Sequence, residues 1–194
     1  MSALPQVHVA LLHHPILNRV GEIVTTGVTN LDIHDLARSS RTYGCAGYWI
    51  VTPIAEQRAM VSRITAHWRD GDGPGLHPQR AEALSLARVA ATLDDVVTAV
   101  TDEAGARPRL VGTTARLERA TVGYDDLAAE LATPGAAPAL LLFGTGWGMT
   151  AATLAACDMI LPPIAASAGR TGYNHLSVRA AAAIVLDRLL GQRR

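Results

Sequence analysis

Three glycines spaced two residues apart follow four apolar residues in the stretch LLLFGTGWGM, residues 140–149. Glycine adopts positive φ angles at little steric cost and lets a ligand approach the main chain closely. The chain contains no lysine, which excludes the Gly-Lys-Ser/Thr phosphate loop, and the spacing differs from the Gly-x-Gly-x-x-Gly dinucleotide fingerprint. The loop alone is therefore as typical of a tight strand-to-helix turn as of a ligand site.

Histidines cluster in the first fifth of the chain, where His13 and His14 follow an apolar run and His34 precedes Asp35. Three imidazoles with nearby carboxylates suggest a metal site or a pH-tuned base. Neighbouring residues at a strand end do not both point at one ion, and neither an H-x-x-x-H pair nor a cysteine partner is present. We therefore expect no metal, and we interpret the segment that contains His14 as a wall that faces a substrate.

Two arginines, Arg38 and Arg41, lie three residues apart in a stretch with helical periodicity. Residues at this spacing share one helix face, and two guanidinium groups on one face can bind phosphate oxygens. The alternative for Arg38 is an ion pair with Asp35, which is also three residues away. Arg179, in a helical pattern of small residues, could pair with a carboxylate of a partner subunit or hold the carboxylate of a cofactor.

Apolar runs alternate with helical patterns along the chain, which predicts an α/β fold with a parallel sheet covered by helices on both faces. In such folds ligands bind at the carboxyl ends of the strands, where the glycine loop lies. Asn30 or Asp32 is the expected N-cap of the first helix, and Asn174 is a candidate N-cap of the last. We expect strands at 7–12, 47–52, 109–114, 139–143, 159–163 and the end of 83–91, helices at 31–44, 54–68, 92–105, 124–133, 150–156 and 174–190, and a loop at 69–78.

Composition and length set the broad class of protein. The 194 residues fit one domain, 1–194, and nearly half are apolar, which is sufficient for a sizeable core. The net charge of zero argues against a strongly basic nucleic-acid binder, although a local basic patch stays possible. Two cysteines in apolar surroundings fit a reducing compartment. Without an export signal or an apolar run of about 18 residues, the chain is expected to be cytoplasmic with no membrane span.

Three stretches in order, residues 29–51, 140–149 and 158–190, resemble the signature motifs of the SPOUT class of RNA methyltransferases. Arg38 and Gly44 match the spacing of the first motif, and Asp32 stands where the class usually has Asn. The blocks HHPILNRVGE, TNLDIHDLAR, FGTGWG and YNHLSVR are similar to those of one small group within this class. The resemblance covers nearly the whole chain.

The resemblance implies an enzyme that transfers a methyl group from S-adenosylmethionine (SAM) to a nucleotide of tRNA or rRNA. It also implies a C-terminal trefoil knot and a homodimer whose active site forms between the subunits. Arg38 would be catalytic, contacting the target nucleotide. The substrate-binding residues would be His14, Asn18, Arg19, Asn30, Asp32 and Arg41. The cofactor-binding residues would be Phe143, Gly144, Thr145, Gly146, Gly148, Leu161, Pro162, Ile164, Tyr173, Asn174, His175, Leu176 and Ser177.

Two other functions fit parts of the sequence. The first is a nucleotide-binding α/β enzyme of another class, in which the glycine loop holds a phosphate of NAD or a nucleoside triphosphate. The second is an RNA-binding protein that keeps the fold without catalysis. The role of Trp147 is open between covering the cofactor, covering an RNA base and acting as a buried spacer. Residues 67–80 form either a connector or an RNA-contacting lid.

Overall fold

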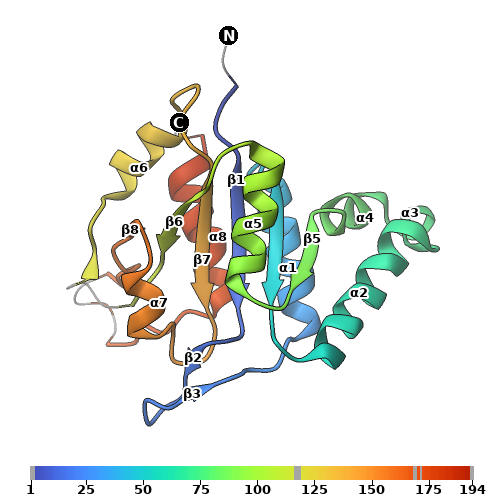
Figure 1. Cartoon of the computed structure of the whole chain (residues 1–194), viewed down its shortest axis with the longest axis horizontal. Helices are drawn as coiled ribbons and strands as arrows, with labels where there is room; N and C mark the ends of the chain where they lie inside the picture. Colours follow the sequence, from blue (N-terminus) through green and yellow to red (C-terminus); the bar gives the residue numbers. More distant parts are fainter. Residues whose placement is uncertain (1–2, 116–118, 168–169, 171, 193–194) are drawn as a thin grey trace.

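The computed structural model describes residues 3–115, 119–167, 170 and 172–192 of the chain (Figure 1). Its centre is a six-stranded sheet in which all neighbouring strands are parallel. The strands, in spatial order, are β5 (Ala87–Ala90), β4 (Gly47–Val51), β1 (Val7–Leu12), β7 (Ala139–Gly144), β6 (Arg109–Gly112) and β8 (Met159–Ile160). The predicted parallel α/β architecture is thus confirmed.

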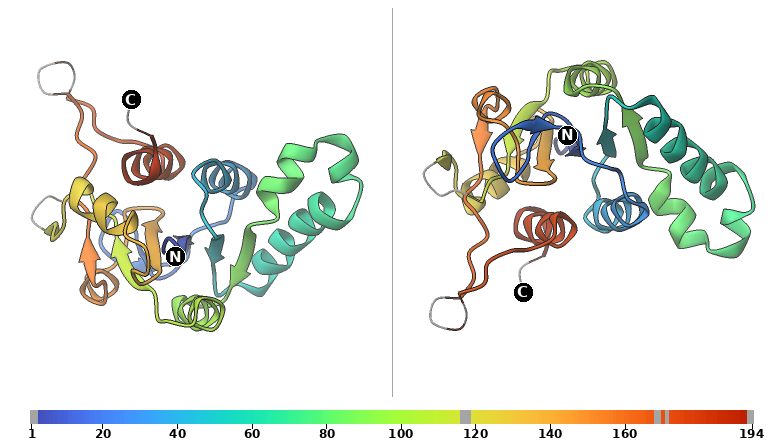
Figure 2. Two further views of the ribbon diagram at one scale, coloured as in Figure 1. Left: turned by 90° about the horizontal axis from the view of Figure 1, so that it is seen from above. Right: turned by 90° about the horizontal axis from the view of Figure 1, so that it is seen from below.

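Helices cover both faces of this sheet, as Figure 2 shows in two end-on views. Side chains alternate along β1, so Val9 and Leu11 pack in one core cluster and Ala10 and Leu12 in the other. Both clusters are apolar because a strand buried on two faces has no solvent side. The first cluster includes residues of α1 (Asn30–Thr42), α2 (Ala55–Asp70), α4 (Pro78–Leu84), α6 (Tyr124–Leu131) and α8 (Val178–Leu190), and the second residues of α5 (Leu93–Ala104) and α7 (Ala151–Ala155).

The starts of two helices differ from the prediction. Helix α1 is capped by Thr29, whose hydroxyl accepts a hydrogen bond from the Asp32 amide while the Asp32 carboxylate accepts one from the Thr29 amide. This capping box places Asp32 at the third helical position, so neither Asn30 nor Asp32 is the cap. Helix α8 begins only at Val178, with Ser177 as its cap in place of Asn174.

The predicted loop at 69–78 is largely helical. Helix α2 continues to Asp70, a short helix α3 (Gly73–Leu76) follows, and α4 begins at Pro78. Proline at the first position of α4 is compatible with a helix because its missing N–H would have no helical partner there. The other predicted elements are present with bounds shifted by a few residues, and Thr92 caps α5 as expected.

The strand order reverses between β1 and β7, and a ligand crevice is expected at this point of the sheet. From β1 the chain crosses through α1 to β4, whereas from β7 it crosses through α7 to β8 on the other side. Adjacent loops therefore diverge at the carboxyl ends of these strands and leave a hollow between them. A small antiparallel hairpin, β2 (Ile16–Leu17) and β3 (Ile23–Val24), follows β1 at this end (Figure 1).

Within the described part of the chain, none of the helices combines the length and apolar character that a bilayer crossing requires. The threading of the C-terminal segment into a trefoil knot stays a prediction. Residues 168, 169 and 171 of the third block that resembles the SPOUT class lie outside the described residues.

Candidate active site

A cavity of about 880 Å³ lies at the carboxyl ends of β1, β6 and β7. Its walls come from four parts of the sequence: the hairpin and the start of α1, the segment after β6, the glycine loop after β7, and the segment that leads into α8. The lining residues include Leu17, Thr26, Gly27, Thr29, Asp32, Thr113, Thr114, Ala115, Arg119, Tyr124, Phe143, Gly144, Thr145, Gly146, Trp147, Gly148, Met149, Pro162, Ile164, Asn174, His175, Leu176 and Ser177. The cavity brings together most of the predicted cofactor residues.

The glycine loop needs glycine at specific positions. Gly146 and Gly148 have positive φ angles of 54° and 97°, in the left-handed region that L side chains rarely adopt. At Gly144 the reason is space, since a Cβ there would lie 2.8 Å from the backbone nitrogen of Met149. The loop is also fixed to its neighbours, because the Thr145 amide donates to the Leu12 carbonyl oxygen and the Trp147 amide donates to that of Leu17.

Asn174 connects two parts of the cavity wall that leads into α8. Its side-chain amide donates to the carbonyl oxygen of Ile164 at 3.2 Å, and its side-chain oxygen accepts from the amide of Ala166 at 3.0 Å. The segment at 164–166 is therefore joined to Asn174 within this loop. The hydroxyl of Tyr124 donates to the carbonyl oxygen of Pro162 and braces the same turn. Asn174 thus acts as a clamp for a loop that borders the cavity.

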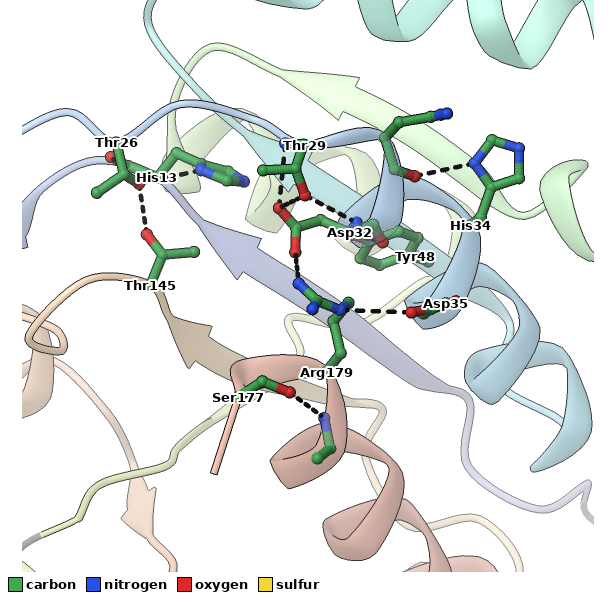
Figure 3. A network of polar contacts seen from close by, with 12 residues as sticks. His13, Thr26, Thr29, Asp32, His34, Asp35, Tyr48, Thr145, Ser177 and Arg179 are labelled. Atoms are coloured by element: carbon green, nitrogen blue, oxygen red, sulfur yellow. Dashed lines mark hydrogen bonds and ion pairs between the residues drawn. The ribbon is translucent and has the colours of Figure 1, made fainter. Parts of the chain in front are cut away.

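The start of α1 is tied to α8 by a buried ion pair, drawn in Figure 3. Arg179 donates from Nη1 to Asp32 Oδ1 at 3.0 Å, and its Nε lies 3.3 Å from Asp35 Oδ2. The second oxygen of Asp32 accepts from the hydroxyl and the amide of Thr29. Both carboxylates belong to its own chain, and the pairing of Arg179 with a partner subunit or with a cofactor carboxylate stays a prediction. Asp35 also pairs with Arg179, so the alternative ion pair between Asp35 and Arg38 is not formed.

A chain of hydroxyl groups connects the glycine loop to the end of β1. The Thr145 hydroxyl donates to the Leu12 carbonyl oxygen and lies 2.5 Å from the Thr26 hydroxyl, which lies 3.0 Å from His13 Nδ1. Either hydroxyl can donate in the contact between Thr26 and Thr145, and the role of His13 Nδ1 depends on the tautomer of the ring. The Nδ1–H tautomer is the one compatible with a Thr145 hydrogen placed on the Leu12 carbonyl oxygen. Burial lowers the pKa of His13, so the ring is neutral at pH 7.

Several predicted site residues lie outside this cavity. Arg38 is exposed on α1 and lines a separate shallow hollow with Arg179, Ser177 and others. Ser177 lines both hollows, so the two adjoin at the start of α8. Leu161 is fully buried, and Tyr173 is 68% exposed with its ring against His175.

The predicted phosphate patch of two arginines is not assembled as expected, since Glu82 on α4 pairs with Arg41. Asn18 closes the hairpin: its side-chain oxygen accepts from the amides of Val20 and Glu22. Arg19 is exposed in the same turn, Asn30 is exposed at the start of α1, and His14 Nδ1 lies 3.0 Å from the Thr25 hydroxyl. Of the predicted substrate residues, only Asp32 lines the cavity.

Sequence reasoning missed the wall formed by Thr113, Thr114 and Ala115, together with Arg119. The signal was available, because Thr113 and Thr114 end a predicted strand, 109–114, whose carboxyl end shares an edge with the glycine loop. Few side chains on the cavity wall can carry a charge. Among the described lining residues these are Asp32, Arg119 and His175. Across the described chain, groups of three or more potential metal ligands do not occur.

The fold is shared with several solved structures that are described as methyltransferases. A structure described as a probable methyltransferase from Bordetella pertussis Tohama I aligns with a TM-score of 0.61 at 17% identity, over 95% of this chain and 92% of that one. The SpoU methyltransferase AviRb from Streptomyces viridochromogenes, solved with AdoMet, aligns with a TM-score of 0.56 at 19% identity, over 98% of this chain and 58% of that one. At these identities the likeness establishes the fold.

The profile of a family described as SAM-dependent RNA methyltransferase matches residues 6–191. The chain belongs to this family, which is described as dependent on SAM. The sequence-based prediction of the RNA methyltransferase class is therefore confirmed.

Curated relatives share about two fifths of their residues with this chain. A tRNA (guanine-N(1)-)-methyltransferase of Oleidesulfovibrio alaskensis is 42% identical over 185 residues, which is 95% of this chain and 42% of that protein. An uncharacterized protein of Aquifex aeolicus is 42% identical over 188 residues, 97% of this chain and 90% of that protein. The chain thus spans about two fifths of the length of the named relative.

Proposed function

We propose that this chain binds SAM between the glycine loop, the Pro162–Ile164 turn and the entry to α8, and transfers its methyl group to a nucleotide of tRNA. The observation that carries this proposal is the convergence of these three distant segments on one cavity. SAM follows from the family. The choice of tRNA rests on the name of relatives that this chain matches over part of their length.

The residues present fit such a ligand. The absence of a Cβ at Gly144 and Gly146 lets the glycine loop pack closely against Met149 and Ile16, which brings its main chain to the cavity wall, and Leu176 and Ile164 offer apolar surface. Arg119 can pair with a carboxylate, and Asp32 places one negative charge on the wall that a sulfonium ligand would face. SAM supplies an already activated methyl group, so the task of the chain is to hold donor and acceptor in line.

We assign Arg38 to the site of a partner subunit in a homodimer. Arg38 does not line the cavity of its own chain, but its hollow adjoins that cavity at Ser177. Small residues of α8, Ala180 and Ala183, border the same hollow and permit another helix to approach closely. In this arrangement Arg38 contacts the target nucleotide, and the hairpin residues His14, Asn18 and Arg19 form the adjacent RNA-facing wall.

Two measurements test the proposed function. Calorimetry with SAM, NAD and ATP should show binding of SAM alone. Transfer of a tritiated methyl group from SAM to total tRNA, taken from cells that lack the protein, should proceed with the wild-type chain, and mass spectrometry should identify the nucleotide. SAM binding without transfer to tRNA or rRNA would instead indicate a non-catalytic RNA-binding protein.

A mixing experiment tests the placement of Arg38. Arg38→Ala should abolish transfer but retain SAM binding, and Gly146→Ala should lose SAM binding. If Arg38 acts across the interface, a mixture of the two inactive variants forms heterodimers in which one cavity is intact and receives Arg38 from the other subunit, and activity returns. A mixture that stays inactive although heterodimers form would place Arg38 on its own chain or outside the mechanism.

A further inference from the structure

Trp147 combines an exposed ring with a rigid backbone. Its side chain is 64% exposed although it lines the cavity, so the indole stands at the rim. Removing a large aromatic side chain from water is favourable, so an indole at the rim of a cavity can contribute strongly to the binding of a ligand there. The family and the proposed function leave this residue without a role.

The backbone on both sides of Trp147 is held in place. Its amide donates to the Leu17 carbonyl oxygen at 3.0 Å, and the Leu17 amide donates back to the Gly148 carbonyl oxygen at 2.9 Å. A bridge between Ile16 and Met149 extends this pairing by one step. The glycine loop is therefore joined to the hairpin like an added strand, and the backbone that carries the indole has little freedom left to lose on binding.

We propose that Trp147 is the stacking platform for the target nucleobase, an inference that rests on the proposed function. The ring is largely exposed to solvent at the rim of the cavity in which the donor is proposed to bind. Its backbone is hydrogen-bonded to the hairpin that carries Asn18 and Arg19, the proposed RNA-facing residues. A nucleotide taken out of its stack needs a flat apolar surface to replace its neighbours, and an indole provides one.

Substitution of this residue gives the first test. Trp147→Ala should lower kcat/KM for tRNA by about 5- to 150-fold, which is the range of one lost base stack. Trp147→Phe keeps a smaller π-face and should stay within about threefold of the wild type. Neither variant should change the SAM dissociation constant by more than about twofold, because the ring does not enclose the cofactor.

Fluorescence identifies the ligand that meets the ring. The signal of Trp147 is the difference between the wild type and Trp147→Phe, and tRNA should quench this difference while SAM leaves it unchanged. Quenching by SAM together with weaker SAM binding in Trp147→Ala would overturn the proposal and make the ring a cofactor cover. Unchanged kinetics in Trp147→Ala would also overturn it. The kinetic result requires an active wild type and the fluorescence result requires a wild type that binds SAM, so both are distinct from failure of the proposed function.

Discussion

The ion pair between Arg179 and Asp32 joins the two helices that border the cavity, and its removal should have a measurable cost. The Asp32 side chain is 6% exposed and that of Arg179 is 29% exposed. Removing one partner of a fully buried pair costs about 3–5 kcal/mol because the other charge is left without compensation. Asp32 keeps its two hydrogen bonds from Thr29 and its place in the first turn of α1, where the helix dipole favours an anion. We therefore expect Arg179→Met to lower the free energy of unfolding by about 1.5–3 kcal/mol.

Urea unfolding measures this effect directly. With an m-value of about 2 kcal/mol/M, the midpoint should fall by about 1 M. Arg63→Met, an exposed arginine on α2, is the matched control and should shift the free energy by less than about 0.5 kcal/mol. Asp35→Asn should cost less than about 1 kcal/mol, because the Asp35 side chain is 48% exposed. The reasoning is refuted if Arg179→Met unfolds like the control, or if its effect and that of Asp32→Asn add fully in the double variant.

Three further predictions concern the pH response, the glycine loop and a helix cap. Burial lowers the pKa of His8 from 6.5 to about 4, so between these pH values the unfolded chain binds a proton that the folded chain does not. The free energy of unfolding should therefore be highest above pH 6.5 and fall by roughly 3 kcal/mol towards pH 4. The profile should be flatter in His8→Asn, and NMR should show His8 titrating near pH 4. Gly146→Ala combines a positive φ with a Cβ placed 2.9 Å from Ile16 Cγ2, so calorimetry should show SAM binding at least about tenfold weaker, whereas Gly75→Ala, which lies outside the cavity and meets nothing within 4 Å, should bind normally. Thr92→Ala removes the cap of α5 and should cost about 1 kcal/mol in urea unfolding without changing SAM affinity.

Local patterns sufficed for most elements of this fold. The strand at 7–12 and the threonine cap at Thr92 could be predicted because each depends on a few neighbouring residues. The start of α8 could not, since Asn174 and Ser177 are both good caps and the choice depends on a tertiary contact: the side chain of Asn174 is already used on the loop at 164–166. The helical content of 69–78 was hidden by glycine and proline, which end long helices but are tolerated in short ones.

The candidate site likewise combines features that the sequence predicts with features that depend on tertiary contacts. The resemblance located the glycine loop and the entry to α8, but it did not reveal what holds these parts together. The Arg179–Asp32 pair spans 147 positions in the sequence, and the Thr26–Thr145 contact spans 119. Spacing does not predict such pairs, because they depend on which strands become neighbours in the sheet. They become visible only when β1 and β7 are placed side by side.

These contacts connect three of the four walls of the cavity. The glycine loop is joined to the hairpin by backbone hydrogen bonds and by the two threonine hydroxyls, and the start of α1 is joined to α8 through Asp32 and Arg179. The segments that would hold the cofactor are therefore joined to the proposed RNA-facing hairpin and to the helix of Arg38. A donor that displaces the glycine loop on binding would also displace the hairpin, and linkage then requires that donor and acceptor change each other's affinity by the same factor.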